Sequence, residues 1–245
     1  GNEVDLNPNV ANRNKGDRKK PTKNFFSDEA IEKLEEIFFA ESFEYQLRWH
    51  RAGLEHRIRD ILKSRQIGAT FYFSREALLH ALKTGHNQIF LSASKTQAYV
   101  FREYIIQFAR RVDVDLTGDP IVIGNNGAKL IFLGTNSNTA QSHNGDLYVD
   151  EIFWIPNFQK LRKVSSGMAS QSHLRSTYFS TPSTLAHGAY PFWSGELFNR
   201  GRASASERVD IDISHDALAA GVACPDGQWR QIVTIEDALA GGCTL

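Results

Sequence analysis

A segment of eight residues, at positions 63–70, contains the residue types that a phosphate-binding loop needs. It reads Lys63, Ser64, Arg65, Gln66, Ile67, Gly68, Ala69 and Thr70. An apolar stretch precedes the segment and a helical pattern follows it, so backbone N–H groups of the loop and of the helix start would converge on an anion. The ammonium of Lys63 and the fork of Arg65 would balance the charge of the β and γ phosphates. The hydroxyl of Thr70 is a ligand for Mg²⁺, and Gly68 permits close backbone approach.

The same segment departs from the usual phosphate-loop pattern, G-x-x-x-x-G-K-[ST]. When it is aligned on Gly68 and Thr70, Lys63 occupies the first glycine position and Ala69 occupies the lysine position. Lys63 must therefore reach the phosphates from the opposite end of the loop. A polar loop that only joins a strand to a helix remains the alternative interpretation.

A pair of acids follows a short apolar strand further along the chain. Residues 147–149 are apolar, and Asp150 and Glu151 come directly after them. The carboxyl ends of strands are where α/β folds bind ligands, so Asp150 would hold Mg²⁺. Glu151 would then orient and deprotonate an attacking water. The alternative is a pair of solvated loop acids.

A third segment ends in hydroxyl groups. The strand predicted at residues 176–180 is followed by Thr181 and Pro182. Ser180 and Thr181 would lie beside the acidic pair on one sheet edge, where they can sense the γ-phosphate and pass its loss to the following segment. The order of phosphate loop, acidic pair and hydroxyls is more informative than this last motif alone, since Ser-Thr-Pro is a common strand exit.

The elements that must position these motifs alternate between strand and helix. Strands are predicted at residues 57–62, 88–93, 147–149 and 176–180, and helices at 69–83, 95–110 and 159–170. An amphipathic helix from about residue 28, a helical stretch at 44–49, and a hairpin centred on 124–127 complete the pattern. Alternating strands and helices predict an α/β fold with a central, mostly parallel sheet flanked by helices.

Three regions are expected along the chain. Residues 1–24 are polar and basic and predict a disordered linker, residues 25–200 a nucleotide-binding domain, and residues 201–245 a small lid or linker subdomain with a strand at 208–213. Asp210 and Asp212 would share one face of that strand. With no later acidic cluster to complete a metal site, an edge strand is the preferred interpretation.

Composition excludes several classes of protein. Of 245 residues, 28 are Lys or Arg and 28 are Asp or Glu, so the net charge is zero and a nucleic-acid-coating protein is not indicated. The two cysteines, Cys224 and Cys243, are too few and too far apart for a zinc site of their own or a disulfide framework. No apolar run is long enough to cross a membrane, and no signal-peptide pattern is present.

Taken in order, these motifs resemble the ATPase portion of tailed-phage terminase large subunits. The Arg65-Gln66-x-Gly68-x-Thr70 core resembles the variant phosphate loop of that family, some of whose members carry the lysine at the loop's start. Residues 147–151 match its acidic motif and residues 180–182 its coupling motif. Tyr45 and Gln46 resemble its adenine-recognition element, in which a ring stacks on the base and an amide reads its edge. The resemblance covers roughly residues 41–200.

The resemblance implies a RecA-like, Mg²⁺-dependent P-loop ATPase that pumps double-stranded DNA. Its nucleotide-binding set would be Tyr45, Gln46, Lys63, Ser64, Arg65, Gln66, Gly68, Ala69 and Thr70. It also implies a homo-oligomeric ring, with a portal and a small terminase subunit as partners, in the cytoplasm of a bacterial host. A nuclease domain would be expected after residue 245. Two rivals stay open: a helicase-like ATPase, and a degenerate nucleotide fold that serves as an assembly scaffold.

Overall fold

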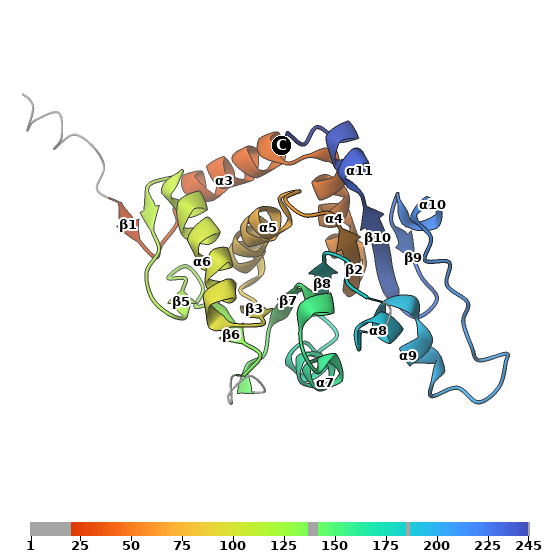
Figure 1. Cartoon of the computed structure of the whole chain (residues 1–245). Helices are drawn as coiled ribbons and strands as arrows, with labels where there is room; N and C mark the ends of the chain where they lie inside the picture. The colour runs from red at the N-terminus through yellow and green to blue at the C-terminus, as the bar shows by residue number, and fades with distance from the viewer. Residues whose placement is uncertain (1–20, 137–141, 185–186, 245) are drawn as a thin grey trace, which may run out of the picture.

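The computed structural model describes residues 21–136, 142–184 and 187–244, which build an α/β fold around one large sheet (Figure 1). Its strands are β2 (Ile58–Lys63), β3 (Gln88–Ser92), β5 (Ile121–Val122), β6 (Lys129–Gly134), β7 (Asp146–Asp150), β8 (Ser176–Ser180), β9 (Val222–Ala223) and β10 (Gln228–Val233). Their order across the eight-stranded sheet is β5-β6-β3-β7-β8-β2-β10-β9. The inner neighbours pair in parallel, and β5 and β9 add antiparallel edges. The predicted fold class is confirmed.

Helices cover both faces of the sheet. They are α3 (Asp28–Glu41), α4 (Glu44–Glu55), α5 (Ala69–Thr84), α6 (Lys95–Arg110), η2 (Ile152–Trp154), α7 (Phe158–Met168), α8 (Tyr190–Ser194), α9 (Glu196–Asn199), α10 (His215–Leu218) and α11 (Ile235–Ala240). Figure 1 shows α3, α4, α5 and α6 on one side and α7, α8 and α9 on the other. Successive residues of a strand face opposite sides of the sheet. In β3, Phe90 therefore packs in the hydrophobic cluster on one face, and Ile89 and Leu91 pack in the cluster on the other face. None of the helices in the described ranges is long and apolar enough to cross a bilayer.

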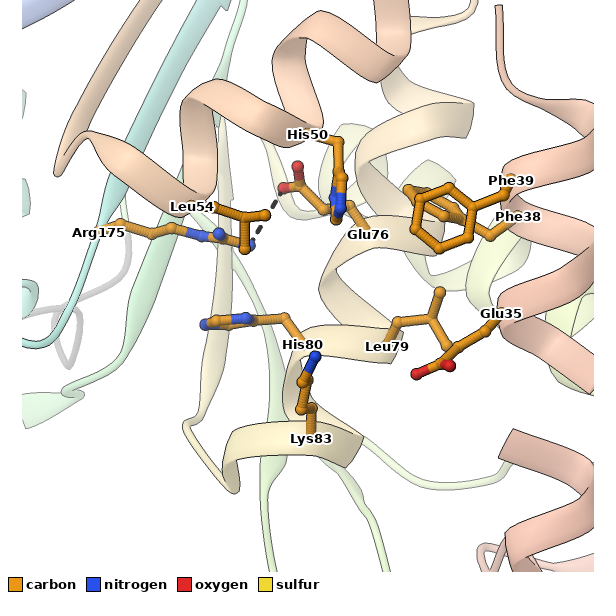
Figure 2. Close-up of a pocket in the computed structure, with 10 residues that line it drawn as sticks. All are labelled: Glu35, Phe38, Phe39, His50, Leu54, Glu76, Leu79, His80, Lys83 and Arg175. Atoms are coloured by element: carbon orange, nitrogen blue, oxygen red, sulfur yellow. Dashed lines mark ion pairs between the residues drawn. The ribbon is translucent and has the colours of Figure 1, made fainter. Parts of the chain in front are cut away.

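A buried ionic network joins α5 to the sheet. Glu76 accepts two hydrogen bonds from Arg59, each 2.7 Å long, and one each from Tyr72 (2.9 Å) and Tyr148 (2.7 Å). Arg175 lies 3.4 Å from the same carboxylate, an ion pair drawn in Figure 2. Burial alone would raise the pKa of Glu76, but the two guanidinium groups hold it well below its ordinary value. Glu76 and Arg175 also line a cavity of about 150 Å³ between α3, α4 and α5.

Most predicted elements agree with the structure to within a few residues, whereas the two chain ends differ. Residues 228–233 form β10, which pairs with β2 along its whole length instead of belonging to a separate lid. The pairing covers an edge of β2 that would otherwise be exposed, and local sequence cannot show such a distant partner. Residues 208–213 form no strand, so the expected edge strand carrying Asp210 and Asp212 is wrong.

At the other end, the predicted linker of residues 1–24 falls mainly outside the described residues, which begin at 21. Within the described part, Thr22–Lys23 forms β1 and pairs in parallel with β4 (Val114–Asp115). Asn24 reinforces this contact, because its side chain donates to the Thr117 carbonyl at 3.0 Å and accepts from the Thr117 N–H at 2.8 Å. The last residues of the expected linker are therefore ordered against the domain.

Candidate nucleotide site at the carboxyl edge of the sheet

Three of the predicted motifs end at one edge of the sheet. β7, β8 and β2 are parallel neighbours, and the acidic pair, the hydroxyl pair and the loop at 64–68 follow their carboxyl ends. The strand order therefore brings the loop close to two motifs that come much later in the chain, after Asp150 at the end of β7 and Ser180 at the end of β8. This is the edge at which α/β folds bind ligands.

The loop between β2 and α5 has the backbone of an anion cradle. Gln66 has φ 60° and Gly68 has φ 77°, so the chain turns through left-handed conformations before α5 begins. No side chain caps the helix start, and the first N–H groups of a helix have no intrahelical acceptor. At the other end of the loop, the Ser64 N–H donates to the Val233 carbonyl at 2.9 Å. A turned loop that leads into a helix start without a side-chain cap suits a phosphate chain.

Lys63 stands at the start of that loop and converges with the acids. Its side chain is only 9% exposed, and its Nζ lies 3.6 Å from Oε1 of Glu151. Burial lowers the pKa of Lys63, and Glu151 and Asp150 partly oppose this shift. The ammonium of Lys63 and the acidic pair therefore lie close together, as the predicted phosphate-binding site requires.

Arg65 is placed differently from Lys63. It lies exposed on the loop beside the exposed Gln66, and it makes no ion pair with any residue in the described ranges. The structure therefore brings one of the two predicted phosphate-binding cations to the acids and leaves the other at the surface. Ala69 and Thr70 occupy the first turn of α5, where Ala69 is buried and Thr70 is half-buried.

Asp150 is a half-buried carboxylate without a cation of its own. The Ser92 hydroxyl donates to its Oδ1, but none of the ion pairs of the described residues includes Asp150. Burial raises the pKa of Asp150 to about 6, and the neighbouring charge of Glu151 acts in the same direction. Carboxylate and hydroxyl oxygens are the ligands that Mg²⁺ prefers, and a divalent cation would offset the charge of the carboxylates. The oxygen donors of Asp150 and Thr70 therefore suit Mg²⁺, and their binding of one ion stays a prediction.

Glu151 is held by the coupling motif. Its backbone adopts the left-handed region (φ 54°), and its N–H donates to the Phe179 carbonyl at 2.7 Å. The Thr181 hydroxyl donates to Oε2 at 2.8 Å and the Thr181 N–H to Oε1 at 3.4 Å. The Ser180 hydroxyl donates to the Thr181 carbonyl at 2.7 Å and accepts from the Phe153 N–H at 3.2 Å. Ser180 and Thr181 thus touch the segment that carries Glu151.

Two residues of this site were missed from the sequence. Ser92 contacts Asp150, and the indole of Trp154 donates to the Thr181 hydroxyl at 2.9 Å. Ser92 ends a strand that neighbours β7, so the same strand-end argument that selected Asp150 applies to it. Trp154 follows the acidic pair in η2 and has no comparable sequence signal, because its contact depends on the turn made by Glu151.

Tyr45 and Gln46 contact the loop itself. The Tyr45 hydroxyl donates to the Ile67 carbonyl at 2.6 Å, and the Gln46 amide donates to the Gly68 carbonyl at 3.2 Å. The Tyr45 ring is buried and stacks on Phe43, with centroids 5.7 Å apart. Both side chains are therefore engaged by the protein, and their predicted contact with an adenine stays a prediction.

Comparison with known proteins identifies the family. Residues 60–245 match the family described as terminase large subunit, T4likevirus-type, N-terminal. The chain belongs to the terminase large-subunit family. It is 89% identical over 245 residues to the terminase ATPase subunit of Escherichia phage P2, covering all of this chain and 42% of that relative. The chain therefore spans less than half the length of this terminase.

Solved terminases share the fold. The large terminase ATPase domain of Thermus phage P74-26 has a TM-score of 0.56 at 18% identity, covering 91% of this chain and 89% of that one. The large terminase of a thermophilic bacteriophage, solved in complex with ADP, has a TM-score of 0.58 at 12% identity. This match covers 81% of this chain and 47% of that one. At these identities the likeness extends to the terminase fold alone.

Proposed function

We propose that this chain hydrolyses ATP to power the movement of double-stranded DNA, as the motor portion of a terminase large subunit. Membership of the family and the relative named as an ATPase subunit support this function. The observation that carries it is the meeting of Lys63 and Glu151, 3.6 Å apart, at the carboxyl ends of two parallel strands, β2 and β7, that flank β8. A buried cation and a carboxylate beside a free helix N-terminus fit a triphosphate and the water that attacks it.

In this proposal the loop binds the phosphates. Backbone N–H groups from Arg65 to Thr70 surround the β and γ oxygens, and Lys63 offsets their charge from the loop's start. Arg65, now at the surface, turns inward when the phosphates are bound and uses its bidentate fork. Tyr45 and Gln46 hold the loop backbone in place through their contacts with Ile67 and Gly68.

Asp150, Thr70 and Glu151 carry the chemistry. Asp150 and Thr70 would hold Mg²⁺, whose charge would offset that of the phosphates. Glu151 orients the attacking water and accepts its proton as general base. Lys63 now pairs with Glu151, and a bound triphosphate would attract the lysine away. Glu151 would thereby be released to act as a base only when substrate is present.

The coupling motif connects this chemistry to movement. Thr181 contacts both oxygens of Glu151, and its own oxygen accepts from Trp154. Directly after Thr181, residues 182–184 line a cavity of about 190 Å³ with Phe153 and Trp193. When Glu151 changes partners, Thr181 must follow it, and the residues beside that cavity can shift. We propose this segment as the element that transmits hydrolysis to DNA or to a neighbouring subunit.

The wider assembly rests on the family. We propose a homo-oligomeric ring on double-stranded DNA, with a portal and a small terminase subunit as partners, in the cytoplasm of the host cell. The relative from Escherichia phage P2 is named a terminase ATPase subunit, which supports the ATPase role, whereas the ring and the partners remain to be tested.

Steady-state ATP hydrolysis with and without duplex DNA tests the function. Glu151→Gln should lower turnover by at least about 100-fold while ATP affinity stays within a few-fold, because the base acts after binding. Glu207→Gln, at an exposed glutamate away from the site, is the matched control. Lys63→Ala should weaken binding of ATP. Normal turnover in Glu151→Gln would overturn the assignment, and ATP binding without hydrolysis in the unmodified chain would favour the scaffold.

A further inference from the structure

Two histidines and a buried aspartate meet at the opposite, amino-terminal edge of the sheet. His80 is on the last turns of α5, His86 follows that helix, and Asp146 is the first residue of β7. Nε2 of His80 lies 3.1 Å from Oδ2 of Asp146, and Nδ1 of His86 lies 3.2 Å from the same oxygen. One ligand atom from each residue lies within 4.8 Å of the other two. Figure 2 shows the His80 ring extending towards the side where Arg175 lies, away from Phe38 and Phe39.

The surroundings hold Asp146 in one orientation. Its Oδ1 accepts the Arg175 N–H at 2.9 Å, so Oδ2 is the oxygen that faces the histidines. The Gln88 amide also donates to Oδ2, at 2.9 Å. Three nitrogen atoms thus approach one oxygen, although a carboxylate oxygen offers about two lone-pair sites. If all three contacts were hydrogen bonds, one of the three nitrogen atoms would lack a lone pair on Oδ2 to which it could donate.

A metal ion removes that conflict. We propose that His80, His86 and Asp146 form a binding site for Zn²⁺ or a similar late first-row divalent cation. Zinc bonds to nitrogen and oxygen are about 2.0–2.2 Å long, so ligands around a tetrahedral ion lie roughly 3.3–3.5 Å apart. The two nitrogen–oxygen distances here, 3.1 and 3.2 Å, are close to this spacing. Gln88 and the Arg175 N–H would supply the outer hydrogen bonds that ligating carboxylates require.

The site has an opening for a further ligand. Asp146 is fully buried, but the side chains of His80 and His86 are 19% and 24% exposed. The exposed His173 lies on this side as well, with its ring centroid 5.0 Å from that of His86. A water can therefore complete the coordination. A bound metal would link the end of α5 to the first residue of β7. At the opposite edge of the sheet, α5 begins directly after the phosphate loop and β7 ends at Asp150.

Zn²⁺ binding to the chain tests this site directly. Tag-free chain treated with chelator is titrated with Zn²⁺ by calorimetry and with Co²⁺ by visible absorption. We expect one equivalent to bind, and we expect His86→Gln and Asp146→Asn each to weaken binding at least about tenfold. His86 is partly exposed, so its variant should fold even if the Asp146 variant does not.

Two further variants serve as controls. His215 forms another His–carboxylate pair, with Asp237 at 2.7 Å, and His215→Gln should leave affinity unchanged. Asp150→Asn should also retain the metal, because that carboxylate lies at the other edge of the sheet. The proposal is overturned if no saturable equivalent binds, if His86→Gln keeps full affinity, or if Asp150→Asn abolishes binding.

Discussion

Two carboxylates, the buried Glu76 in the core and the half-buried Asp150 at the edge of the sheet, have opposite environments. Glu76 receives two hydrogen bonds from Arg59 and one each from two tyrosines, with a second arginine nearby, and its pKa is lowered despite burial. Asp150 receives one serine hydroxyl and has Glu151 as its neighbour, and burial raises its pKa to about 6. Tyr148 on β7 contacts Glu76, so the two environments are two residues apart on one strand.

This difference separates a structural group from a functional one. A fully paired buried charge is already satisfied by the protein and has nothing left to bind. A carboxylate that is shielded from water without a paired cation makes the native state less stable. Binding of a cationic ligand beside it would therefore stabilise the native state. We therefore expect substitutions at the two positions to change stability in opposite directions.

Removal of the charge at Glu76 should have the largest effect. Glu76→Gln leaves Arg59 and Arg175 buried without a counter-charge, so we expect unfolding free energy to fall by roughly 3–5 kcal/mol near pH 7. The folded-state pKa of Glu76 is depressed, so its contribution is present above its ordinary value of 4.5 and is lost as pH falls below it. Denaturant unfolding at pH 7 and pH 4 measures both effects. An equal loss at both pH values would contradict this explanation.

The change at Asp150 should act in the other direction. Asp150→Asn removes a charge that burial disfavours, so we expect it to stabilise the chain by up to roughly 3 kcal/mol at pH 8. Since the folded-state pKa is raised from 3.8 to about 6, the gain should shrink as pH falls through 6 and vanish below 4. Turnover should be lost at the same time. Destabilisation at pH 8 would show that Asp150 is a structural group like Glu76.

The comparison also explains what the sequence could predict. Asp150 and Glu151 follow an apolar strand, and Lys63 follows another, so local pattern and strand-end logic place all three at one edge. The network of Glu76 has no local pattern, because Arg59, Arg175 and Tyr148 come from distant parts of the chain. For the same reason β10 was assigned to a separate subdomain: its parallel pairing with β2 depends on residues about 170 positions away.

The directions of the side chains are a further property that the sequence did not predict. Tyr45 and Gln46 were selected by resemblance as base-binding residues, yet their hydrogen bonds go to the loop backbone. Arg65 and Lys63 are two residues apart in one motif, but only Lys63 reaches Glu151. Spacing identifies the loop, but it does not show that Lys63 ends the buried strand β2 while Arg65 lies in the exposed turn that follows.

A substitution at Thr181 tests how Glu151 is positioned. Thr181→Val removes the hydroxyl that donates to Oε2 and accepts from Trp154, so we expect turnover to fall about tenfold with ATP affinity nearly unchanged. Thr22→Val, at an exposed threonine of β1 in the separate two-stranded sheet, is the matched control. Unchanged turnover in Thr181→Val would mean that Lys63 and the backbone alone position Glu151. A pH–rate profile that keeps its shape would show that the base itself is intact.

The smallest expected effect is at Tyr45, where two roles give different results. Tyr45→Phe keeps the ring but loses the hydrogen bond to Ile67, so we expect roughly 0.5–1.5 kcal/mol less stability. If the hydroxyl anchors the loop, affinity should fall a few-fold for ADP and for inorganic tripolyphosphate alike, because both bind through phosphates. If only the ring matters, through stacking on adenine, both affinities should stay unchanged in Tyr45→Phe, while Tyr45→Ala should weaken ADP far more than tripolyphosphate. Tyr190→Phe controls for loss of a phenol hydroxyl elsewhere in the chain. We expect the loop-anchoring result, because the Tyr45 ring is already buried against Phe43.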